Sequence, residues 1–218
     1  MTDLYLVAQL VRAVIIAVAA LFPIVNPLGS APIFLSLTRE YPACVRQNLV
    51  RRITLNSFIL LAVSTLIGSH VLHFFGISIP VVQVAGGLIV SATGWSLLTQ
   101  KDADSKSPKI DPVAATQKAF YPLTLPVTVG PGSISVAITL GADAGRSSYV
   151  WPVVLATAII GPLIVALSVY ICYRSAARFE RILGEAGIGV FLRLSAFIVI
   201  CIGVQITWNG VAALIHGL

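Results

Sequence analysis

The chain has 218 residues, of which 57% are hydrophobic and only 10% are charged, and its mean hydropathy is +0.96. Soluble domains carry about 25% charged residues, so the composition excludes a soluble protein and predicts one transmembrane domain over residues 1–218. The net charge of +6 does not indicate nucleic-acid binding, because the basic residues lie between apolar spans. The three cysteines have no disulfide or metal-site spacing, and we expect no metal and no cofactor.

The first apolar segment, residues 5–38, is too long for one straight span. As a continuous helix it would measure about 51 Å at 1.5 Å per residue, against a hydrocarbon core of about 30 Å. It contains Pro23, Asn26 and Pro27, and a proline inside a helix costs about 3 kcal/mol or more. We therefore expect the helix to break at Asn26, with Asn26 as the N-cap and Pro27 opening a second half-helix.

The fourth apolar segment, residues 118–141, repeats this pattern. Prolines and glycines interrupt it between 126 and 131, where Gly130 can cap and Pro131 can begin a second half-helix. The other spans are expected at 53–75, 81–99, 150–173 and 190–215, with a basic loop at 174–189. The sequence thus predicts an all-α membrane protein with six transmembrane helices, of which the first and fourth are broken.

The two halves of the chain resemble each other weakly. Repeat 1 covers residues 1–100, a polar cytoplasmic loop covers 100–117, and repeat 2 covers 118–218. Pro27 matches Pro131 at an offset of 104, Gly76 matches Gly184 at 108, and Gly94 matches Gly203 at 109. Three spans per half imply opposite insertion, which is a 3+3 inverted-topology repeat of the kind found in secondary transporters.

The basic residues predict the orientation. The loops after the first, third and fifth spans hold 12 of the 14 Lys and Arg residues, and only Arg12 and Arg146 lie on the other side. The positive-inside rule places those three loops in the cytoplasm and both termini outside.

The two breaks predict a binding site. Helix N-termini hold anionic groups through free amides and the helix dipole, and two interrupted spans in matching halves point to a transporter's substrate site. The free amides belong to residues 28–30 and 132–134, and the unwound carbonyls near 23–25 and 127–129 can accept from an ammonium group. The candidate substrate-binding residues are Asn26, Pro27, Leu28, Gly29, Ser30, Thr128, Gly130, Pro131, Gly132 and Ser133.

The main-chain groups suit a zwitterion with a small side chain, and the positions of the acidic residues narrow the choice of substrate further. All eight acidic residues lie in predicted loops or the N-terminal tail, namely Asp3, Glu40, Asp102, Asp104, Asp111, Asp143, Glu180 and Glu185. A cationic substrate would need a carboxylate within the membrane, so a lysine or arginine carrier is disfavoured. Either H⁺ or Na⁺ stays open as a coupling ion, although proton coupling through a buried carboxylate is disfavoured.

Alternatives come from other functional classes. A small-solute channel would share the breaks, and a membrane protein without transport activity stays open. An intramembrane enzyme is not expected, because His70 and His73 end the second span and no Gly-x-Ser-x-Gly motif occurs. The glycines Gly86, Gly87, Gly94 and Gly203 are expected to pack helices closely.

The chain resembles the MarC family of six-span membrane proteins, also called SnatA-type neutral amino acid transporters. The resemblance rests on Pro-Ile-Val-Asn-Pro-Leu-Gly-Ser-Ala-Pro-Ile-Phe at 23–34 and Val-Gly-Pro-Gly-Ser-Ile at 129–134. Further matches are Ala-Gly-Gly-Leu at 85–88 with Gly94, and the closing segment 205–210. The resemblance implies a prokaryotic cytoplasmic (inner) membrane protein that moves small neutral amino acids such as glycine and alanine, with the family's broken first and fourth spans at Asn26-Pro27 and Gly130-Pro131.

Overall fold

The computed structural model describes residues 2–38, 41–99, 119–146 and 151–216, and every regular element in these ranges is helical. In chain order the elements are α1 (Thr2–Val25), α2 (Pro27–Leu37), α3 (Ala43–Phe74), α4 (Ile79–Thr99), η1 (Ala119–Thr128), α6 (Pro131–Arg146) and α7 (Trp151–His216). The all-α prediction is therefore confirmed for the described residues. The predicted polar loop at 100–117 lies outside them.

Five segments are long and apolar enough to cross a membrane, and a sixth is bent. The five are Tyr5–Leu35, Ala43–Phe74, Ile79–Thr99, Trp151–Arg178 and Gly187–His216. The helices Ala119–Thr128 and Pro131–Ala144 pass the same test together, with a bend of 71° between them. Large apolar side chains such as Ile15, Ile59 and Val204 point outward, where a bilayer would surround them.

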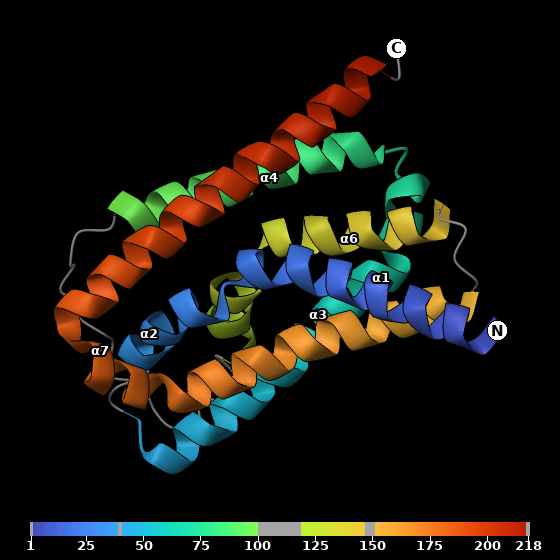
Figure 1. Cartoon of the computed structure of the whole chain (residues 1–218). Coiled ribbons are helices and arrows are strands. Elements are labelled where there is room, and N and C mark those ends of the chain that lie inside the picture. Colours follow the sequence, from blue (N-terminus) through green and yellow to red (C-terminus); the bar gives the residue numbers. More distant parts are fainter. Residues whose placement is uncertain (1, 39–40, 100–118, 147–150, 217–218) are drawn as a thin grey trace.

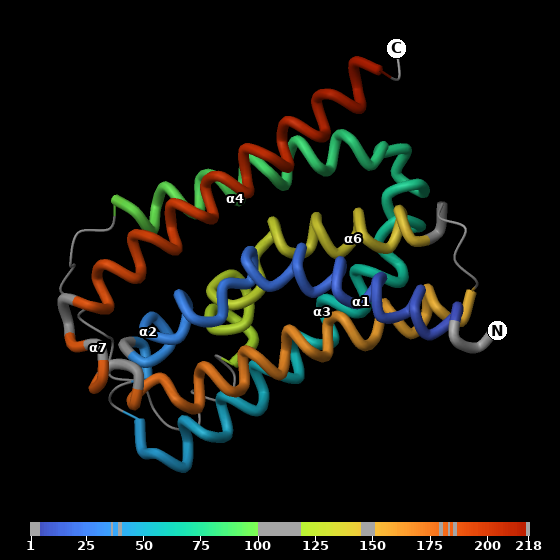
Figure 2. Tube along the Cα trace, in the orientation of Figure 1, coloured from blue at the N-terminus to red at the C-terminus, as the bar shows by residue number. Residues whose placement is uncertain are grey.

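The helices run back and forth between two ends of the molecule, as Figures 1 and 2 show. The start of α1 and the end of α7 lie at the same end, together with the turn from α3 to α4. The opposite end holds the end of α2, the start of α3 and the bend in α7. We call this the basic end, because Arg51, Arg52, Arg174 and Arg178 belong to these segments.

The fifth and sixth spans belong to one helical element that turns at a single glycine. Gly184 has φ 65° and ψ 173°, and the chain is helical on both sides of it. The predicted loop at 174–189 is therefore wrong in extent. This stretch is rich in Ala, Arg, Glu and Leu, which favour helix, so one glycine with positive φ is enough to reverse the chain direction.

The last arm of α7 packs along α4 through glycines (Figure 1). A Cβ placed on Gly87 would lie 2.6 Å from the Gly203 carbonyl oxygen, and one on Gly203 would lie 2.7 Å from that of Gly87. Gly94 approaches Ala196 in the same way, and Gly210 approaches Pro80. The prediction of close helix packing by glycines is confirmed for Gly87, Gly94 and Gly203, and Gly210 is a further close contact that was not predicted.

These glycine contacts repeat in pairs at an offset of 116 residues. The contact of Gly94 with Ala196 is matched by the contact of Gly210 with Pro80. Gly210 lies 116 residues after Gly94, and Ala196 lies 116 residues after Pro80. The Ser91 hydroxyl donates to the Gly87 carbonyl at 2.9 Å, as Thr207 donates to Gly203 at 2.9 Å. The contact between the two helices therefore has approximate two-fold symmetry. It relates Gly203 to Gly87, not to Gly94 as the sequence comparison matched it.

Candidate functional site

The first interruption lies at Asn26, between α1 and α2. Asn26 has φ 46° and ψ 59°, a left-handed conformation that Asn tolerates better than most residues. Its side-chain oxygen accepts the Gly29 N–H at 3.1 Å, so the N-cap prediction is confirmed. The segment Tyr5–Leu35 still forms one span across this residue.

The cap determines which main-chain groups stay open at this interruption. The Gly29 amide donates to Asn26, and the Ser30 amide donates to the Asn26 carbonyl at 3.0 Å. Of the three amides predicted to be free, only that of Leu28 has no acceptor among the described residues. The carbonyls of residues 23–25 lose their helical donors, because Pro27 has no N–H, the Leu28 amide donates to no described residue, and the Gly29 amide donates to Asn26.

The second interruption lies at Val129 and Gly130, between η1 and α6. In η1 the bonds reach back five residues: the Val129 amide donates to the Thr124 carbonyl at 2.8 Å, and the Thr128 hydroxyl donates to that of Leu123 at 2.7 Å. In α6 the Ile134 amide donates to the Gly130 carbonyl at 3.2 Å. This bond satisfies an amide that was predicted to be free.

The open groups at the second interruption match those at the first. The amides of Gly132 and Ser133 have no acceptor among the described residues. The carbonyls of residues 127–129 receive no main-chain hydrogen bond from the described residues. The first interruption thus presents one open amide and the second presents two, in each case from the second half-helix, together with open carbonyls from the first half-helix. This arrangement can hold an anionic group and a cationic group.

The interruptions lie side by side in the middle of the molecule. The helices α2 and η1 are in contact, as are α1 and α6, and Figure 2 shows the two breaks next to each other. Val25 and Val129 belong to one buried cluster. The structure therefore brings the two predicted halves of the site together.

The predicted site residues differ in what they face. Pro27, Ser30, Thr128 and Ser133 are buried, as is Gly29 next to its Asn26 cap, while Asn26, Leu28 and Gly130 are half-buried. Pro131 is exposed. Gly132 is buried against α4, where an added Cβ would collide with the Val90 side chain. Close packing therefore explains Gly132 without any ligand.

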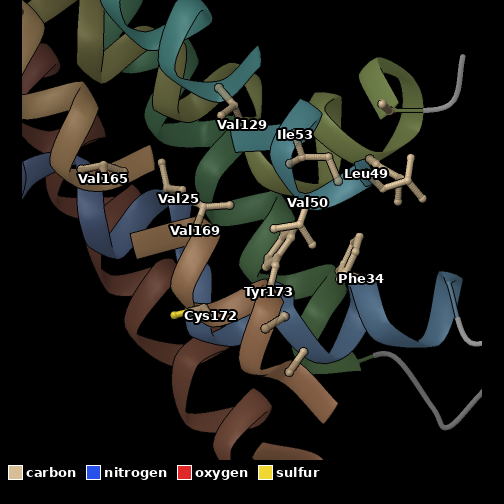
Figure 3. Close-up of a cluster of buried hydrophobic side chains, with 14 of the residues drawn as sticks. Val25, Phe34, Leu49, Val50, Ile53, Val129, Val165, Val169, Cys172 and Tyr173 are labelled. Carbon is tan, nitrogen blue, oxygen red and sulfur yellow. The ribbon is translucent and has the colours of Figure 1, made fainter. Parts of the chain in front are cut away.

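Tyr173 of α7 connects the site to the basic end, and sequence reasoning missed it. Its hydroxyl lies 2.8 Å from the Thr128 hydroxyl, and its ring stacks on Phe34 with centroids 4.6 Å apart (Figure 3). Tyr173 and Phe34 are only 2% and 0% exposed. A tyrosine beside Arg174 at the end of a span is typical of the membrane interface, so the sequence held no signal for this role.

A cavity of about 750 Å³ lies at the other end of the molecule. Its walls come from α1, α3, α6 and α7, and its mouth includes the exposed residues His73 and Trp151. Its inner lining includes Leu21 and Pro162. Leu21 precedes Asn26 by five residues, or about 7.5 Å of helix, so the cavity approaches the first interruption from this side.

Comparison with known proteins identifies the family. The family model described as "MarC family integral membrane protein" matches residues 11–215. The chain is 34% identical to the UPF0056 inner membrane protein MarC of Salmonella typhimurium, over 95% of this chain and 97% of that protein. It is 32% identical to the protein of the same name from Escherichia coli O6:H1, with the same coverage. No solved structure matches. The chain therefore belongs to the MarC family of integral membrane proteins.

Proposed function

We propose that this MarC-family protein is a secondary transporter of small neutral amino acids, such as glycine and alanine, that works by alternating access. The observation that carries the proposal is the pairing of open main-chain groups at two adjacent interruptions. The amides of Leu28, Gly132 and Ser133 bind the substrate carboxylate, and the carbonyls of residues 23–25 and 127–129 bind its ammonium group.

The expected neutrality of the substrate side chain follows from the side chains around the interruptions. Ser30, Thr128 and Ser133 are neutral, and Val25 and Val129 are apolar. A substrate with a charged side chain would therefore stay uncompensated in this site.

An inverted repeat fits this site. The two interrupted spans begin the two halves, and the symmetric contact between α4 and the last arm of α7 joins the two third spans. Under this proposal the offset grows from 104 at the interruptions to 116 at the third spans because repeat 2 has a longer connection. The excess of basic residues at one end supports both termini outside and an inner-membrane location like that in the relatives' names.

The closed packing at the basic end favours a carrier over a channel. Buried side chains fill the space between the interruptions and that end, while the cavity opens toward the other end. Access from one side at a time is what alternating access requires. A channel would need a path through both ends.

Uptake of labelled glycine by purified protein in liposomes tests the proposal. We expect uptake that saturates with glycine concentration, that alanine competes for, and that lysine and glutamate do not inhibit. Sodium and proton gradients imposed separately identify the coupling ion, or show exchange without one. Uptake that rises linearly with concentration would indicate a channel, and no uptake of any neutral amino acid above that of empty liposomes would contradict the proposal.

A further inference from the structure

We infer that Tyr173 is the gate residue on the basic end, and that its hydrogen bond to Thr128 and its ring stack on Phe34 keep the site closed to that side. This inference rests on the proposed function and concerns the regulation of the same site. It assigns a role to a side chain from the fifth span, outside both interrupted segments.

Three spans line the cavity along one half of their length. Along the other half, toward the basic end, their side chains pack in the core and form what we call the seal. In the first span Ala17 and Leu21 line the cavity although both are buried, whereas Val25 and Phe34 are buried in the core and do not line the cavity. In α3 the lining residues include Thr65 and His70, whereas Ile53, Val50 and Leu49 are buried. In α7 Ala158 and Pro162 line the cavity although both are buried, whereas Val165, Val169 and Tyr173 are buried and do not line the cavity. The seal therefore begins at the depth of the interruptions and continues toward the basic end (Figure 3).

Tyr173 connects three separate helices within this seal. Phe34 comes from α2, beyond the first interruption, and Thr128 comes from η1, before the second. The planes of the Phe34 and Tyr173 rings are only 14° apart. Both half-helices on the basic side of the site are thus held to the fifth span through one side chain.

The direction of the hydrogen bond follows from the Thr128 hydroxyl, which has one hydrogen. Thr128 donates that hydrogen to the Leu123 carbonyl at 2.7 Å. The Tyr173 hydroxyl therefore donates to the Thr128 oxygen across the 2.8 Å contact. Removing the phenol oxygen deletes this bond and leaves the ring stack in place, while Thr128 keeps its bond to Leu123.

Opening toward the basic end requires the half-helices to leave Tyr173. Phe34 must slide off the ring, and the hydroxyl pair must separate. One buried hydrogen bond changes an equilibrium by about 2- to 12-fold, so its loss shifts the population toward the open form by that factor. The seal weakens without any change in the amides and carbonyls that hold the substrate.

Cysteine labelling tests the gate without reference to any substrate. In a background with Cys44→Ser, Cys172→Ala and Cys201→Ala, Val169→Cys reports on the seal, because Val169 is fully buried one turn from Tyr173. Ala158→Cys reports on the cavity side. A membrane-impermeant methanethiosulfonate is applied separately to each face of oriented vesicles, and the labelling rate of each reporter is measured.

We expect slow labelling of Val169→Cys from the basic side and a rise of about 5-fold when Tyr173→Phe is added. Thr128→Val removes the same bond from its other partner and also the Thr128 bond to Leu123, so it should give a rise at least as large, and adding Tyr173→Phe should give no further rise. The matched control is Tyr170→Phe, one turn earlier in the same helix, whose hydroxyl accepts from exposed Arg174 at 2.6 Å. This control should leave the labelling rate unchanged.

The outcomes separate the gate from the transport proposal. Fast basic-side labelling of Val169→Cys in the presence of Tyr173, or equal rates for Tyr173→Phe and Tyr170→Phe, would overturn the inference. A rise at Val169→Cys with a matching fall at Ala158→Cys supports both the gate and alternating access. A rise at Val169→Cys with unchanged Ala158→Cys supports the gate and contradicts alternating access.

Discussion

Substituting Gly203 by alanine measures how closely α4 and the last arm of α7 approach. Alanine is favoured over glycine in a helix by about 1 kcal/mol. Against this, its Cβ would lie 2.6 Å from the Ser91 amide nitrogen and 2.7 Å from the Gly87 carbonyl oxygen. Both atoms belong to the main chain, so the helices must separate, and overpacking of this kind costs about 1–3 kcal/mol. We expect Gly203→Ala to lose up to about 2 kcal/mol.

Gly189→Ala is the matched control, since it lies in the same helix and its Cβ would have no neighbour within 4 Å. It should gain up to about 1 kcal/mol. Both variants share the gain in helix propensity, so they differ by the overpacking cost of about 1–3 kcal/mol. At roughly 2–4 °C per kcal/mol, their melting temperatures in detergent should differ by roughly 2–12 °C. Because the contact is symmetric, Gly87→Ala should behave like Gly203→Ala. A Gly203→Ala protein that melts at or above Gly189→Ala would refute the close approach.

Two further predictions concern single glycines. Gly184→Ala should lower the free energy of unfolding by about 1–3 kcal/mol, because φ 65° with ψ 173° is accessible almost only to glycine; thermal melting against wild type measures this, and an unchanged melting temperature would contradict the bend. Gly86→Ala should destabilise through collision with Ser135, whose atoms are the three nearest to that Cβ. Ser135→Gly also loses the Ser135 bond to the Val82 carbonyl, but the double variant should be more stable than the sum of the two single changes, because Ser135→Gly removes the colliding atoms. A double-mutant cycle in the same melting assay should give a coupling of about 0.5–3 kcal/mol, and simple additivity would argue against the contact.

The interruptions could be predicted because proline acts locally. Pro27 and Pro131 lack an amide hydrogen wherever the rest of the chain lies, and Asn before proline supplies a cap. The sequence therefore located the ends of the half-helices without tertiary information. Which amides stay open was less predictable: the Asn26 side chain and the first helical bonds satisfy three of the six.

The neighbours of the site could not be predicted from the chain alone. Membrane helices are apolar on all faces, so periodicity does not show which side of the fifth span faces inward, and Tyr173 was overlooked for this reason. The pairing of glycines between the two halves of the sequence was wrong for a related reason. It paired Gly94 with Gly203, whereas the packing relates Gly203 to Gly87, and only the contact between the two helices distinguishes these choices.

Replacing Asn26 by aspartate tests most directly whether the paired interruptions hold a substrate carboxylate. Aspartate caps a helix as well as asparagine and tolerates positive φ, so Asn26→Asp should fold and melt like wild type. Its charge would lie beside the open amides, where it competes with the substrate carboxylate. We predict normal thermal stability with saturable glycine uptake reduced more than about 10-fold, the factor for about 1.4 kcal/mol. Wild-type glycine uptake by a stably folded Asn26→Asp protein would contradict the site.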